Sequence, residues 1–153
     1  MRENHLWNSA RDVQFKVSDE ILPGFDVGFD DRICEETKDA LMRFAYWVED
    51  HFAMPVTLWV DFKYNHYLVD QAGKRVDYKF YWVDFADYPV FTNWDDIPVI
   101  ELAVRTDRRS LEEILHSFAE AISDYYIWLS NQDPRNYQPD PETVEEILSA
   151  YRN

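Results

Sequence analysis

Residues 110–131, SLEEILHSFAEAISDYYIWLSN, decide the fold, because they form the longest helical pattern in the chain. Apolar residues recur three and four positions apart, as in a helix that packs one face against a core. Ser110 is a typical N-cap, and Glu113 three residues later completes a capping box. Such a helix is about 30 Å long at 1.5 Å per residue, so we expect it to cover one face of a sheet.

The same stretch carries the most interpretable chemistry of the sequence. His116, Glu120 and Asp124 are spaced four residues apart, which places three potential metal ligands along one face of the helix. Three interpretations are open at this point. The residues form an ordinary polar stripe with His116 hydrogen-bonded, or they form a non-catalytic metal site with zinc as the candidate ion, or they form a repurposed acid–base site.

Patterns on either side of this helix predict the remaining elements. Asp30 or Asp31 is expected to cap an earlier helix that ends near Phe52, and Asp140 followed by Pro141 begins a last helix. Alternating apolar residues predict strands, and Gly73 suits a hairpin turn with positive φ. The expected segments are a short strand at 13–17, strands at 56–62, 76–85 and 98–105, an extended piece at 64–69, a turn at 70–73 and a loop at 86–96.

The order of these elements indicates the fold class. Strands grouped between helices are typical of an α+β protein with a mainly antiparallel sheet, here of about four strands between an N-terminal helix and the two C-terminal helices. A chain of 153 residues is expected to form one domain, with residues 1–29 as a possible arm and residues 30–153 as the body. Tyr78, Phe80 and Trp82 share one strand face, which is usual for core or cross-strand packing. A ligand-binding role is the alternative, because exposed aromatic patches mark interfaces.

Charge and composition restrict the function. A net charge of −15 and an aromatic content of 17% predict a folded chain that repels nucleic acid and anionic membranes. The acidity either attracts a basic protein, imitates a phosphate backbone, or only maintains solubility. The single cysteine, Cys34, is expected to be a buried inert thiol. The polar N-terminus lacks the apolar segment of a signal peptide, so we expect a cytoplasmic protein.

The residues at both ends of the 116–124 ligand pattern in the long helix resemble those of a known family. Residues 114–119 read ILHSFA and residues 125–129 read YYIWL, which is similar to the active-site helix of small bacterial zincin-like metallopeptidases with an H-E-x-x-H motif. The strand at 99–104, VIELAV, resembles the strand that precedes this helix in the family. The resemblance covers about residues 55–129 and implies a zincin-like fold and a bacterial or phage origin.

This chain departs from the family at the residues that carry its chemistry. Glu120 and Asp124 stand where the family has its two histidine ligands, and Ala121 replaces the general-base glutamate. Because alanine accepts no proton, the resemblance implies a catalytically inactive relative. We therefore expect a non-catalytic acidic binding protein, an inhibitor or immunity-type partner of a basic protein such as a nuclease or another nucleic-acid-binding protein. The alternatives are a metal-dependent hydrolase with His116, Glu120 and Asp124 as ligands, and an acidic nucleic-acid mimic.

Overall fold

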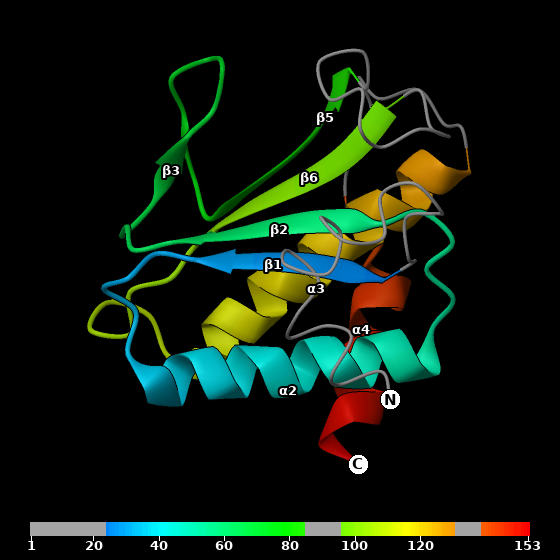
Figure 1. Ribbon diagram of the computed structural model, residues 1–153, viewed down its shortest axis with the longest axis horizontal. Coiled ribbons are helices and arrows are strands. Elements are labelled where there is room, and N and C mark those ends of the chain that lie inside the picture. The colour runs from blue at the N-terminus through cyan, green and yellow to red at the C-terminus, as the bar shows by residue number, and fades with distance from the viewer. Residues whose placement is uncertain (1–23, 85–95, 131–138) are drawn as a thin grey trace, which may run out of the picture.

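The computed structural model describes residues 24–84, 96–130 and 139–153, in which one four-stranded sheet packs against helices on one of its sides (Figure 1). The strands of this sheet are β1 (Phe25–Phe29), β2 (Leu58–Lys63), β5 (Tyr78–Asp84) and β6 (Asp96–Ala103). A small hairpin is formed by β3 (Leu68–Val69) and β4 (Arg75–Val76). The helices of the described residues are α2 (Glu35–His51), α3 (Leu111–Leu129) and α4 (Pro141–Arg152).

The sheet is mixed rather than mainly antiparallel. Its strand order is β1-β2-β6-β5, with β1 parallel to β2, β2 parallel to β6, and β5 antiparallel to β6. The α+β class is confirmed, whereas the expected antiparallel sheet is wrong. The reason is the long connection between β2 and β6, which contains β3, β4 and β5 and returns the chain in the direction of β2. Alternation of side chains identifies a strand but not the partner beside it.

The N-terminal part of the described chain joins this sheet directly. Phe25–Phe29, which we expected in the arm, form the edge strand β1, and α2 connects β1 to β2 as a parallel crossover. The helix begins later than predicted, at Glu35. Asp30 instead closes a turn, because its Oδ1 accepts the backbone N–H of Arg32 at 2.9 Å.

Cys34 is exposed, so the expectation of a buried thiol is wrong. The residue is the N-cap of α2 and has extended backbone angles, which place it outside the apolar stripe of the helix. Its Sγ lies 3.2 Å from Thr37 Oγ1. Hydrogen bonding to Thr37 lowers the pKa of the Cys34 thiol.

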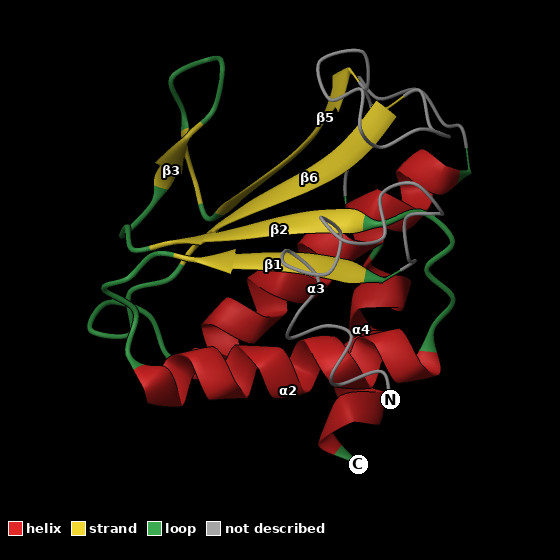
Figure 2. Cartoon of the chain, viewed as in Figure 1, coloured by secondary structure: helices red, strands yellow, loops and turns green. Residues whose placement is uncertain are grey.

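The core forms between one face of the sheet and the helices (Figure 2). Alternate residues of β2 are buried, in the order expected for a strand with one covered face. Phe118 of α3 lies at the centre, with ring centroids 5.7, 5.4 and 5.4 Å from those of Phe25, Phe44 and Phe62. These contacts join α2, α3 and two strands and fix the position of α3 under the sheet.

Several local predictions are confirmed by hydrogen bonds and backbone angles. The capping box is present, since Glu113 N–H donates to Ser110 Oγ at 3.2 Å and Ser110 N–H donates to Glu113 Oε1 at 2.9 Å. Asp140 caps α4, and Gly73 has a φ of 84° in the hairpin turn. The expected strand at 13–17 lies outside the described residues, as does the expected loop at 86–96 except for Asp96, which begins β6.

Among the helices of the described residues, none has the length and apolar character needed to cross a membrane.

Candidate binding cleft

The three candidate ligands of α3 lie on one helix face but in very different surroundings. The side chain of His116 is 53% exposed and that of Glu120 is 29% exposed, with His116 Nδ1 3.5 Å from Glu120 Oε1. Asp124, one turn further on, is only 5% exposed as a residue. Within residues 24–84, 96–130 and 139–153, no group of three or more His, Cys, Asp or Glu is placed to hold a metal ion.

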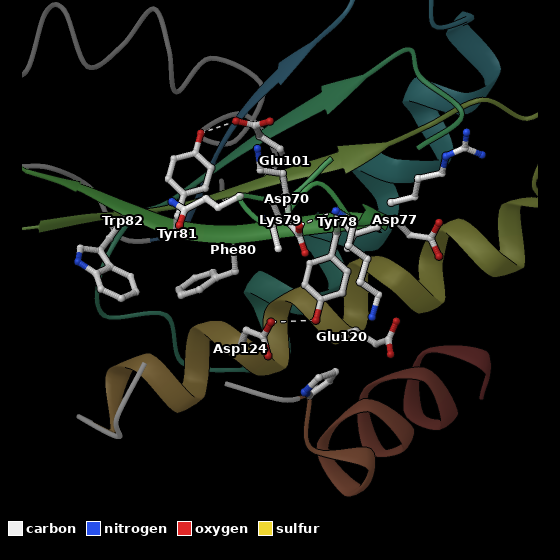
Figure 3. Close-up of a pocket in the computed structure, with 16 residues that line it drawn as sticks. Asp70, Asp77, Tyr78, Lys79, Phe80, Tyr81, Trp82, Glu101, Glu120 and Asp124 are labelled. Atoms are coloured by element: carbon white, nitrogen blue, oxygen red, sulfur yellow. Dashed lines mark hydrogen bonds between the residues drawn. The ribbon is translucent and has the colours of Figure 1, made fainter. Parts of the chain in front are cut away.

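Asp124 is held by a residue from the sheet. Tyr78, the first residue of β5, donates its hydroxyl hydrogen to Asp124 Oδ2 at 2.8 Å (Figure 3). The other carboxylate oxygen, Oδ1, is buried and has no hydrogen-bond partner in the described part of the chain. A buried polar atom without a partner is uncommon in folded proteins and calls for an explanation.

The surroundings of Asp124 disfavour its charged form. Burial is the largest cause, and it raises the pKa of Asp124 to about 6, with a smaller increase from the charge of Glu120. The hydrogen bond from Tyr78 opposes this rise. Burial and the nearby Asp124 carboxylate in turn raise the pKa of Tyr78, so the phenol stays protonated and keeps its role as donor. The pair is thus a partly buried phenol–carboxylate link between β5 and α3.

Asp124 lines a cleft of about 1280 Å³ that follows β5 and the β3–β4 hairpin. Glu120 and Asp124 come from α3, whereas the other charged groups come from the hairpin and the sheet (Figure 3). Among the described lining residues, carboxylates outnumber cations. The carboxylates are Asp70, Asp77, Glu101, Glu120 and Asp124, and the cations are Lys74, Arg75 and Lys79.

Aromatic side chains of β5 also line the cleft. Phe80 packs against the core, with its ring centroid 6.5 Å from that of Trp128, as expected for this face of the strand. Trp82 is 37% exposed and extends the aromatic surface outward. Tyr81 points to the other side of the strand and donates its hydroxyl hydrogen to Glu101 Oε2. The cleft therefore combines carboxylates with aromatic surface, the residue types suited to a cationic ligand.

Ala121 lies away from this cleft. It is fully buried in the core cluster, although its neighbour Glu120 faces the cleft. The position of Ala121 corresponds to the general-base glutamate of the zincin-like motif. The resemblance therefore implies that a side chain at this position would point toward the metal ligands. Here the position faces the core, where a glutamate would lose its hydration.

The sequence pointed to Asp124 but not to the residues that surround it. Tyr78 is 46 residues away in the chain, and no spacing rule connects it to α3. Its predicted role on an aromatic face was core packing, and it does pack against the core. The sequence feature that could have indicated a polar contact is the tyrosine itself, because a tyrosine hydroxyl that is buried usually finds a hydrogen-bond partner.

No protein-family model, curated protein or solved structure matches this chain. The likeness to zincin-like metallopeptidases therefore stays a prediction from the sequence, and the function has to be inferred from the site.

Proposed function

We propose that the protein is a non-catalytic binding protein whose cleft between β5 and α3 accepts a cationic side chain of a basic partner. Asp124 carries this proposal, because it is 5% exposed, lines the cleft and has one buried oxygen without a partner in the described chain. An unsatisfied buried acceptor costs about 1–3 kcal/mol. A lysine or arginine from a partner would satisfy it.

The electrostatics of the chain support a basic protein as the partner. A net charge of −15 attracts a cationic surface over long range and increases the rate of encounter. Trp82 and the other aromatic residues beside the carboxylates are side chains that often dominate binding energy. An inhibitor or immunity-type protein for a nuclease or another nucleic-acid-binding protein is the biological role that this surface fits best.

The proposal is tested with a heptalysine peptide as the probe in titration calorimetry. The double variant Glu120→Gln/Asp124→Asn removes two charges from the cleft. Glu145→Gln/Glu146→Gln removes two charges from the exposed side of α4. We expect the cleft variant to bind at least about tenfold more weakly than wild type, since loss of one partner of a buried charge pair costs about 2–5 kcal/mol. The α4 variant should change affinity by less than about twofold.

Equal losses in the two double variants would contradict the proposal, because net charge alone would then explain the binding. Binding should also weaken below pH 6, since the raised pKa of Asp124, about 6, means that its carboxylate is protonated there. Salt dependence addresses the nucleic-acid mimic: a partner affinity that is insensitive to salt would argue against it.

The metal-dependent hydrolase is the alternative for the same helix face. Its test is calorimetry with zinc, comparing wild type with His116→Ala. Uptake at micromolar zinc that disappears in the variant would favour a metal site on this helix face, which the hydrolase requires. Unchanged or absent uptake would argue against His116, Glu120 and Asp124 as a metal site.

A further inference from the structure

A second pocket lies at the edge of the sheet where the three parallel strands end. The segments that follow β1, β2 and β6 are at the same end of the sheet, next to the β3–β4 hairpin (Figure 1). They contribute Arg32, residues 64–69 and Arg105 to a pocket of about 520 Å³. The carboxyl ends of parallel strands are where sheets of α/β type most often bind ligands.

The lining of this pocket is richer in cations than the chain as a whole. Its described lining contains three cations, Arg32, Lys79 and Arg105, and one carboxylate, Glu101. The whole sequence has 30 acidic and 15 basic residues. Repulsion of an anion by carboxylates more than about 8 Å away is screened at physiological ionic strength. The groups in the pocket, together with the aspartates paired with its arginines, therefore decide which ligand enters.

Two guanidinium groups of the pocket are held in fixed orientations. The Cζ atoms of Arg32 and Arg105 lie 5.1 and 4.6 Å from the ring centroid of Tyr64. Arg32 donates from Nε and Nη2 to Asp30, at 3.0 and 2.9 Å. Arg105 donates from the same two atoms to Asp107, at 3.0 and 2.6 Å.

This arrangement neutralises part of each positive charge but leaves donors available. Each guanidinium has five N–H groups, and the paired aspartate engages only its Nε and Nη2 edge. The hydrogen bonds from both guanidinium groups to their aspartates start from Nε and Nη2, so these pairs leave the Nη1 atoms for a ligand. Because stacking and pairing already restrict both side chains, a ligand would cost less conformational entropy to bind.

A histidine in the pocket provides the independent observation. His66 Nε2 is buried and has no hydrogen-bond partner in the described chain, and His66 lines the same pocket as the two arginines. In the Nε2–H tautomer this atom is a donor that needs an acceptor. A ligand with several acceptor oxygens would satisfy His66 and the guanidinium groups together.

We propose that this pocket binds a phosphate group, carried by a small molecule or as free phosphate. A phosphate group has more acceptor oxygens than a carboxylate, so it can accept hydrogen bonds from both guanidinium groups and from the imidazole at once. Arginine forks suit phosphate geometry in particular. The volume of about 520 Å³ falls in the usual range of small-molecule sites. Lys79 and Glu101 line both this pocket and the cleft, whereas Arg32, His66 and Arg105 line only this pocket. The inference therefore does not depend on the function proposed above.

The test uses titration calorimetry with inorganic phosphate, glycerol 3-phosphate and acetate as probes. Arg105→Gln removes a cation of the pocket, and Arg43→Gln removes an exposed cation of α2 as the charge-matched control. We expect one saturable phosphate site per chain, weakened at least about tenfold by Arg105→Gln and less than about twofold by Arg43→Gln. Tighter binding of glycerol 3-phosphate would identify a phosphorylated small molecule as the ligand, and tighter binding of inorganic phosphate would identify the free ion.

Three results would overturn the proposal. The first is no saturable binding up to roughly 10 mM phosphate, a limit that corresponds to very weak affinity. The second is an equal loss of phosphate affinity in Arg105→Gln and Arg43→Gln. The third is acetate binding as tightly as phosphate. His66→Phe serves as a second variant if Arg105→Gln unfolds, and it should also weaken phosphate binding. The variant Asp124→Asn should leave phosphate binding unchanged, which keeps this test independent of the cleft.

Discussion

Replacing Asp124 by asparagine should make the protein more stable at neutral pH. Burial raises the pKa of Asp124 from its usual 3.8 to about 6. Each pKa unit corresponds to about 1.4 kcal/mol, so the difference corresponds to about 3 kcal/mol. Because Asp124 is 5% exposed, solvent screening reduces this value little.

The sign follows from proton binding. The folded state has the higher pKa, so it binds more protons than the unfolded state between pH 3.8 and about 6. The contribution of Asp124 to stability is therefore fully present below pH 3.8 and is lost as the pH rises through about 6. Asparagine does not titrate, and its amide oxygen can still accept the hydroxyl hydrogen of Tyr78.

The assay is urea unfolding monitored by tryptophan fluorescence between pH 4 and pH 8. We expect the difference in unfolding free energy between Asp124→Asn and wild type to move by about 3 kcal/mol in favour of the variant across this range. The control is Glu145→Gln, on the exposed side of α4. Its difference in unfolding free energy from wild type should change by less than about 0.5 kcal/mol across the same pH range. A pH-independent difference, or a change of the opposite sign, would refute the reasoning. A more stable variant that binds the basic probe poorly would show that the carboxylate is kept for function at the expense of stability.

Four further substitutions test the fold by urea unfolding. Tyr78→Phe removes the hydrogen-bond donor to Asp124 and should destabilise the protein by about 1–3 kcal/mol above pH 6. The loss of stability should be smaller at pH 4, where the carboxyl group is protonated. An equal loss at both pH values would contradict the hydrogen bond between Tyr78 and Asp124. Ser110→Ala should cost about 1 kcal/mol through loss of the α3 cap, and an unchanged midpoint would show that the cap is not needed. Gly24→Ala should destabilise the protein more than Gly73→Ala, although both glycines have positive φ. An added Cβ at Gly24 would lie 2.2 Å from a buried carboxylate oxygen, whereas an added Cβ at Gly73 would have no atom within 4 Å. Equal losses of stability would exclude the clash as the cause.

Prediction from the sequence succeeded for features that depend on a few neighbouring residues. The capping box of Ser110 and Glu113 and the spacing of His116, Glu120 and Asp124 are set by helix geometry alone. The same spacing could not tell how deeply each side chain is buried. Exposure falls from His116 to Asp124 because the second half of α3 lies under β5, a contact made by residues far away in the sequence.

The sequence by itself determined the helices, the turn at Gly73 and the acidic character of the chain, because local backbone preferences and composition act without tertiary contacts. Only the tertiary structure decided which strands pair in parallel, which face of α3 lines a cleft, and that Tyr78 meets Asp124. It also brought Arg32, His66 and Arg105 together at one end of the sheet. Strand pairing and desolvation depend on residues that are distant in the chain, so the raised pKa of Asp124 and the arginine pocket exist only in the folded protein.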